Sequence, residues 1–273
     1  STQLAGQRNK IINGAMMINQ RGFGSTPANY DYLTDRFQFR ATQSSKFTVT
    51  QSTTAPAGFT NSLAFTSSSN YSVGSTDQFG VRQFIEGVNI SDLAWGTPNA
   101  KSVTLSFWVY SSLTGTHSGA LGNSGDARAY PFSFTVSSAS AWEQKTVTIA
   151  GDTSGAWLTT TGIGIKVNFN LGAGSSMLGT ANAWTTGEIV GVTGAVSVVG
   201  TIGATFYITG VQLEKGATAT PFENRLYGAE LALCQRYYEK CYDISTVPGT
   251  ATANGSATII FGTATTGTIG LGV

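Results

Sequence analysis

Hydrophobic and polar residues alternate along much of the chain, and this alternation predicts β-strands because successive side chains of a strand point to opposite faces. The clearest case is the segment 163–171, whose apolar positions are Ile163, Ile165, Val167, Phe169 and Leu171. The same pattern marks the segments 47–49, 63–65, 79–81, 103–110, 132–136, 147–149 and 206–208. After the last segment the alternation slips at Gly210, which predicts a β-bulge.

No helical pattern separates these segments, so we predict antiparallel sheets and a mainly-β fold, an antiparallel β-sandwich or jelly roll. The composition agrees, because 34 of the 273 residues are glycine and only 11% are charged, against roughly 25% in an average protein. The segments 111–129 and 172–187 are rich in Gly, Ser, Thr and Asn. We predict that both are loops.

One segment is typical of a helix. Thr220-Pro221-Phe222-Glu223 has the form of a capping box with proline at the first helical position, which predicts a helix over 221–242 unless Gly228 delays its start. The spacing along this helix is 4-3-4-3, as in a heptad seam, at Tyr227, Leu231, Cys234, Tyr238 and Cys241. Two interpretations remain open: the helix lies on its own sheet, or it packs against other copies in an oligomer.

The predicted domain organisation follows from this helix. Residues 1–220 form the jelly-roll sandwich, residues 221–242 form a linking helix, and residues 243–273 start a second β region. That last region is rich in Thr and Gly and too short to bury a core alone, so we expect neighbouring subunits to complete it. Cys234 and Cys241 lie about 10 Å apart along a helix, too far for a disulfide.

The charge balance excludes several classes of partner. The chain has 15 basic and 14 acidic residues and a net charge of +1, which leaves no basic surplus for the phosphates of a nucleic acid. No apolar run reaches the roughly 18 residues that a membrane-spanning helix needs. We therefore predict neither nucleic-acid binding nor membrane insertion.

The sequence offers few residues for catalysis. His117 is the single histidine and falls in a predicted loop, a poor place to hold a general base, and no phosphate-binding glycine motif is present. The nearest carboxylate pairs, Asp31/Asp35 and Asp77/Glu86, belong to no glycosidase motif. Glu214, near a strand end, is a lone candidate oxygen donor for calcium. We predict a non-enzymatic protein without catalytic residues, cofactor or metal.

Aromatic side chains are the best candidates for binding. Aromatic rings stack on the apolar faces of sugar rings, while Asn, Gln and Asp side chains form hydrogen bonds with the sugar hydroxyls. The candidate glycan contacts are Trp157, Trp184, Trp142, Trp108 and Tyr110. The alternative for each tryptophan is that it fills the core of the sandwich.

Two parts of the sequence resemble a known family. The opening NKIINGAMMINQRG (9–22), followed by YLTDRF (32–37), is similar to the start of many fibre and appendage proteins of tailed bacteriophages. The segment YITGVQLEKGATATPFE (207–223) resembles the same family, and YGAELALCQRYYEK (227–240) looks like the helix that closes its jelly roll. The resemblance covers roughly residues 9–242.

This resemblance implies a structural protein of the virion, a tail-fibre, head-fibre-like or capsid-decorating component with a jelly roll similar to carbohydrate-binding modules. It implies a homo-oligomer, usually a trimer, that docks on other virion proteins or adheres to host surface polysaccharide, and it carries over no catalytic residue. The alternative is a carbohydrate-binding module of a glycan-active protein, and a glycan depolymerase comes third.

Overall fold

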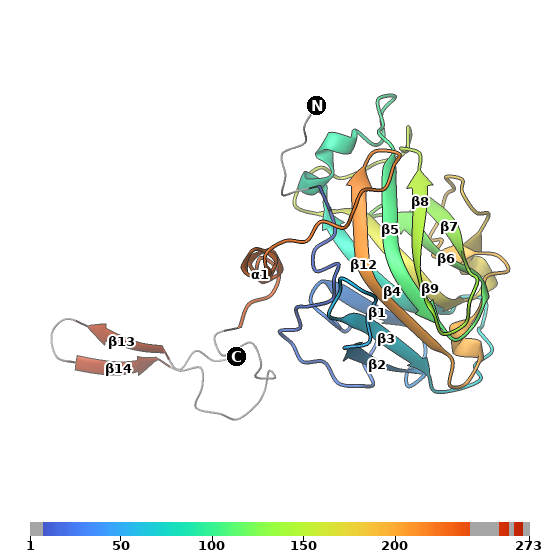
Figure 1. Ribbon diagram of the computed structural model, residues 1–273. Coiled ribbons are helices and arrows are strands. Elements are labelled where there is room, and N and C mark those ends of the chain that lie inside the picture. Colours follow the sequence, from blue (N-terminus) through green and yellow to red (C-terminus); the bar gives the residue numbers. More distant parts are fainter. Residues whose placement is uncertain (1–7, 241–256, 262–264, 270–273) are drawn as a thin grey trace.

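The computed structural model describes residues 8–240 and the backbone of two further strands, β13 (Ala257–Phe261) and β14 (Thr265–Ile269), which pair antiparallel. Two five-stranded sheets pack face to face (Figure 1). Sheet A has the order β1 (Phe37–Ala41), β4 (Gln78–Glu86), β9 (Ile163–Ala173), β6 (Gly115–Gly122) and β7 (Ala129–Val136). Sheet B has the order β2 (Phe47–Ser52), β3 (Ser62–Ser67), β12 (Thr205–Lys215), β5 (Val103–Ser111) and β8 (Trp142–Ile149).

All neighbouring strands in both sheets are antiparallel, so the predicted mainly-β sandwich is confirmed. Between β9 and β12 lie a short parallel pair, β10 (Leu178–Gly179) and β11 (Gly191–Val192), and two 3-10 turns, Ser175–Met177 and Val198–Gly200. Two more 3-10 turns, Gly87–Asn89 and Ser91–Leu93, follow β4. Within the described residues, no helix has the length and apolar character needed to cross a membrane.

The core consists of phenylalanines and aliphatic residues from the inner faces of both sheets. Phe107 of sheet B illustrates the packing, because its ring centroid lies 5.0 Å from those of Phe134 and Phe169 of sheet A. Each buried side chain of this size contributes about 1.5–3 kcal/mol to folding. The alternation of the sequence therefore identifies the core face of most strands correctly.

The predicted bulge is also present. The register of β12 against β5 shifts between Thr209 and Gln212, and Gly210 has φ +62°, a left-handed conformation that glycine adopts without strain.

The prediction that His117 lies in a loop is wrong. It belongs to β6, where its side chain is 1% exposed and its ring stacks near Phe134 and Phe206 at centroid distances of 5.8 and 5.7 Å. The strand escapes detection because it contains glycines where alternating apolar residues are expected. Gly119 is required by packing, since a Cβ there would lie 2.3 Å from the carbonyl oxygen of Asn168.

The predicted capping box is wrong as well. The helix α1 covers Tyr227–Gln235, its N-cap is Leu226, and no side chain caps it. Thr220 and Glu223 instead form tertiary hydrogen bonds with β12 and with the N-terminal segment, described below. Competition from these partners moves the start of the helix to the vicinity of Gly228.

Burial lowers the pKa of His117 below its ordinary value, so the unfolded chain takes up this proton more readily than the folded one. We expect the free energy of unfolding to fall as the pH drops below about 6.5, by at most about 1.4 kcal/mol per pH unit. His117→Gln removes the titration. The stability difference between wild type and this variant, from urea denaturation, should therefore shrink between pH 7 and pH 5, and parallel pH profiles would contradict the burial of a neutral histidine.

Candidate functional site

The outer face of sheet B carries aromatic side chains from three neighbouring strands. Tyr207 of β12, Tyr110 of β5 and Trp142 of β8 are register partners, and all three are half-buried. The ring centroid of Tyr110 lies 5.1 Å from that of Tyr207 and 5.7 Å from that of Trp142. We call these three residues the aromatic row. Their partly exposed rings form a surface on which a flat apolar face can stack.

Trp108 extends the aromatic surface along β5. It lies two residues before Tyr110 and therefore on the same face, opposite the exposed Gln144 of β8. A Cβ on Gly210 would lie 3.0 Å from the Trp108 ring and 2.7 Å from the ring of Phe59. The glycine at the bulge thus lets two rings approach the backbone closely, while Gln144 supplies an amide beside them.

Three of the predicted glycan contacts, Trp108, Tyr110 and Trp142, therefore lie together on one face. Tyr207 completes the row and was missed at the sequence level. The signal for it was present, since Tyr207 stands between the buried Phe206 and Ile208 and must point outward. Its proximity to Tyr110, however, depends on which strands pair.

The other two predicted contacts, Trp157 and Trp184, lie in a separate cluster with Trp95. Their ring centroids are 5.5 Å apart, and those of Trp95 and Trp157 are 4.7 Å apart. Trp157 is 9% exposed, and its indole N–H donates to Oδ2 of Asp152 at 3.1 Å. This cluster packs against the core of the sandwich.

Asp152 anchors the tryptophan cluster. Its two carboxylate oxygens accept hydrogen bonds from Nε and Nη2 of Arg128 at 2.8 and 2.7 Å. Burial alone raises the pKa of Asp152, but the hydrogen bonds from Arg128, Ser154 and Trp157 outweigh it, and the pKa lies below its usual value. A buried carboxylate held in this way stabilises the fold and stays ionised.

The carboxylates considered for catalysis or calcium binding are similarly occupied. Asp77 accepts hydrogen bonds from the hydroxyls of Thr42 and Tyr71, both at 2.8 Å, and Glu86 pairs with Arg236 at 3.0 Å. Glu214 accepts from the backbone N–H and the hydroxyl of Thr220 at 2.8 and 2.7 Å. Nowhere in the described part of the chain do three His, Cys, Asp or Glu side chains gather as metal ligands.

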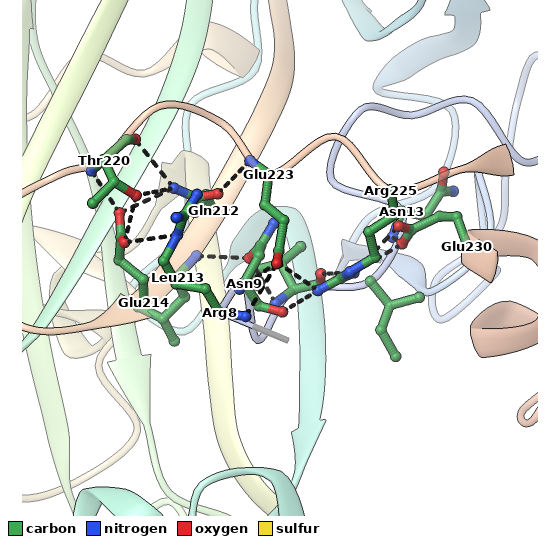
Figure 2. Close-up of polar contacts among 12 residues, drawn as sticks. Arg8, Asn9, Asn13, Gln212, Leu213, Glu214, Thr220, Glu223, Arg225 and Glu230 are labelled. Carbon is green, nitrogen blue, oxygen red and sulfur yellow. Dashed lines mark hydrogen bonds and ion pairs between the residues drawn. The ribbon is translucent and has the colours of Figure 1, made fainter. Parts of the chain in front are cut away.

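The end of β12 on the outer face of sheet B lies against residues 216–226, which we call the strap (Figure 2). The backbone N–H of Glu223 donates to Oε1 of Gln212 at 2.8 Å. The Glu223 carboxylate accepts from the backbone N–H groups of Asn9 and Arg8 at 2.7 and 3.3 Å. These bonds tie the strap both to β12 and to the N-terminal segment.

Arg225 extends this network toward the helix. Its guanidinium lies 3.3 Å from Oε2 of Glu223 and 3.2 Å from Oε2 of Glu230, and it also donates to the carbonyl oxygens of Asn9 and Ile11. Glu230, at the start of α1, accepts a hydrogen bond from the backbone N–H of Asn13. Figure 2 shows these side chains as one continuous network between segments more than 200 residues apart in sequence.

The structure describes four of the five residues of the predicted helix seam. Cys234 is buried against Ile12 and Ile18, and Leu231 packs on the same cluster, so these two face the chain's own N-terminal segment. Tyr227 is 50% exposed. The ring of Tyr238 lies 3.6 Å from the guanidinium carbon of Arg21, and Cys241 lies outside the described residues.

Comparison with solved structures gives a similarity of fold. A putative sugar binding protein from Bacteroides thetaiotaomicron VPI-5482 is 12% identical with a TM-score of 0.46, over 77% of this chain and 100% of that chain. The family 11 carbohydrate-binding module from Clostridium thermocellum, in complex with a β-1,3-1,4-mixed-linked tetrasaccharide, is 11% identical with a TM-score of 0.36, over 72% of this chain and 97% of that chain.

The enzymatically active domain of bacteriophage CBA120 tailspike protein 4 is 13% identical with a TM-score of 0.40, over 76% of this chain. The matched region spans only 21% of that tailspike chain. No family model matches the sequence, and no curated protein sequence is significantly similar to it. These likenesses concern the sandwich architecture and assign no ligand or site residue.

We expect Glu223→Ala to lower the free energy of unfolding by about 1–3 kcal/mol, because it leaves the N–H groups of Arg8 and Asn9 and the Arg225 guanidinium without their acceptor. Urea denaturation measures this loss. Glu239→Ala, at an exposed glutamate, is the matched control and should change stability by less than about 0.5 kcal/mol. Equal effects of the two substitutions would show that the strap network contributes nothing to stability.

Proposed function

We propose that this protein binds a glycan without catalysing a reaction on it, and that the aromatic row is the contact surface. The observation that carries the proposal is the alignment of three partly exposed rings, Tyr207, Tyr110 and Trp142, across adjacent strands of sheet B. Aromatic side chains on strands are fixed by the sheet, so a sugar that stacks on them costs little ordering of the protein.

The polar groups around the row fit the same ligand. The phenol groups of Tyr110 and Tyr207 belong to the row itself, and the exposed Gln144 lies beside Trp108. Hydroxyl and amide groups both donate and accept hydrogen bonds, as a sugar hydroxyl does. The surface thus combines flat apolar area with uncharged hydrogen-bonding groups, which suits a neutral saccharide.

A second proposal concerns the setting in which this binding takes place. The resemblance of segments 9–22, 207–223 and 227–240 to phage fibre proteins favours a virion appendage, homotrimeric, that docks on other virion proteins and attaches to host polysaccharide. One structural observation supports self-association: Leu226 and Tyr227, at the start of α1, are 83% and 50% exposed. Apolar side chains of this size in solvent are available to another copy. The alternative is a carbohydrate-binding module of a glycan-active protein, which would use the same aromatic row.

The glycan proposal is tested by the double variant Tyr110→Ala/Trp142→Ala on a glycan array and, for any hit, by titration calorimetry. Each stacked ring contributes about 0.5–1.5 kcal/mol, so we expect at least about a fivefold loss of affinity with unchanged circular dichroism. Tyr30→Ala, at a tyrosine that is 51% exposed elsewhere, is the matched control.

If Trp184→Ala loses binding while the double variant keeps it, the glycan site lies at the tryptophan cluster and not at the aromatic row. Release of reducing ends from a bound polysaccharide would contradict the non-enzymatic part of the proposal and favour the depolymerase.

The oligomer proposal is tested by light scattering after size exclusion at two protein concentrations. A trimer should give three times the chain mass of 28.4 kDa, and the double variant Leu226→Ser/Tyr227→Ser should dissociate on dilution. Ile202→Ser, at an apolar residue that is 60% exposed elsewhere, should leave the mass unchanged. A wild-type mass of a single chain at both concentrations would refute the trimer.

A further inference from the structure

A cavity of about 130 Å³ lies where the end of α1 meets the N-terminal segment and the turn before β1. It shares no residue with the aromatic row, and the proposed glycan binding does not use it. Two arginines contribute to its wall together with three tyrosines. Its lining residues are Arg21, Tyr32, Asp35, Arg36, Cys234, Tyr237 and Tyr238, and we call it the arginine cavity.

Arg36 is a buried cation that forms no ion pair within the described residues. It is only 8% exposed, and its Nε is buried without a hydrogen-bond partner in that part of the chain. The guanidinium stacks on the ring of Tyr237 at 3.3 Å and donates one hydrogen bond, to the carbonyl oxygen of Phe84. In residues 8–240 no carboxylate forms an ion pair with it. A buried charge left in this state costs several kcal/mol unless something compensates it.

Arg21 brings a second guanidinium to the same cavity. Its central carbon lies 3.6 Å from the ring of Tyr238 and 5.0 Å from that of Tyr32. Within the described residues these two ring contacts are the interactions of the Arg21 side chain, which forms no hydrogen bond or ion pair there. Two planar N–H donor groups with unused donors therefore line one space between tyrosine rings.

Asp35 does not supply the missing negative charge. Its carboxylate accepts hydrogen bonds from the backbone N–H of Gln20 at 2.9 Å and from the side-chain amide of the same residue, and it pairs with neither arginine. Burial raises the pKa of the Cys234 thiol, which keeps this residue neutral. With two guanidiniums against one carboxylate, the lining has an excess of one positive charge.

The backbone holds Arg36 in this position at a cost. Its φ is +74°, in the left-handed region that non-glycine residues rarely occupy. The turn of residues 33–36 is fixed by hydrogen bonds from the N–H of Phe37 to the carbonyl oxygen of Thr34 and from that of Leu33 to the carbonyl oxygen of Phe37. Burial of the guanidinium also lowers the pKa of Arg36, and an anion in the cavity would oppose that shift.

We propose that the arginine cavity binds a small organic monocarboxylate. A carboxylate matches the planar fork of a guanidinium and accepts two parallel hydrogen bonds from it, and its single charge balances the lining. The tyrosine rings cover the apolar body of the ligand. At about 130 Å³ the cavity is slightly smaller than one of about 150 Å³ that holds benzene. It is partly open, so one six-membered ring is the upper limit for the apolar body of the ligand.

Benzoate and its neutral analogue benzamide provide a matched pair of ligands, titrated into the full chain by calorimetry. We expect saturable binding of benzoate, with benzamide at least about tenfold weaker, since the charge-assisted hydrogen bonds are lost. Arg21→Gln should weaken benzoate about tenfold. Arg40→Gln, at a half-buried arginine of β1 that also lies over a tyrosine ring, is the control and should leave it unchanged.

Equal affinities for benzoate and benzamide, or an affinity unchanged by Arg21→Gln, would overturn the proposal, as would the absence of saturable binding. Displacement of benzoate by an equal concentration of inorganic phosphate would overturn the preference for a carboxylate. The benzoate affinity of Arg36→Gln is interpreted only if urea denaturation shows that this variant is folded. Arg21→Gln tests the proposal whether or not Arg36→Gln folds. Trp142→Ala should retain benzoate binding, which separates this site from the aromatic row.

Discussion

The buried pairing of Glu223, Arg225 and Glu230 with the backbone of residues 8–13 is the interaction on which the arrangement of the outer surface depends. The strap is held across the outer face of sheet B because the Glu223 carboxylate finds N–H donors in the N-terminal segment, which offset the cost of burying its charge. Once the strap is fixed, α1 is directed onto Ile12 and Ile18. The aromatic row lies on a part of the face that the strap leaves accessible.

The network of Glu223, Arg225 and Glu230 illustrates how this chain uses its few charged residues, which pair with one another or with the backbone. Several of its acidic side chains are buried and paired at structural positions, as at Asp152 and Glu214. Against this background Arg21 and Arg36 are an exception, because neither guanidinium forms an ion pair within residues 8–240. The segments 9–22, 32–37 and 227–240 together supply the lining of the arginine cavity.

The two candidate surfaces differ in physical character. The aromatic row is flat, partly exposed and uncharged, and it is held by strand register. The arginine cavity is concave, positively charged and formed where a helix end packs on a left-handed turn. The two proposals therefore concern ligands of different chemistry, a neutral saccharide and a small anion, at places that share no residue.

The sequence by itself determined the strands whose faces alternate, the bulge at Gly210, and the outward direction of Trp108 and Tyr110, because these features depend on local period and backbone conformation. It could not identify β6. Gly119 is required there by close contact with a neighbouring strand, and a glycine adds nothing to the alternation of apolar residues. Nor could it locate the helix start, because Thr220 and Glu223 satisfy a local capping pattern but bond elsewhere, Thr220 to Glu214 of β12 and Glu223 to the backbone of Arg8 and Asn9. Tertiary structure alone decided that Tyr207 joins Tyr110 and Trp142, and that Arg36 meets Arg21. Both depend on which distant segments pair, and a local sequence pattern does not contain that information.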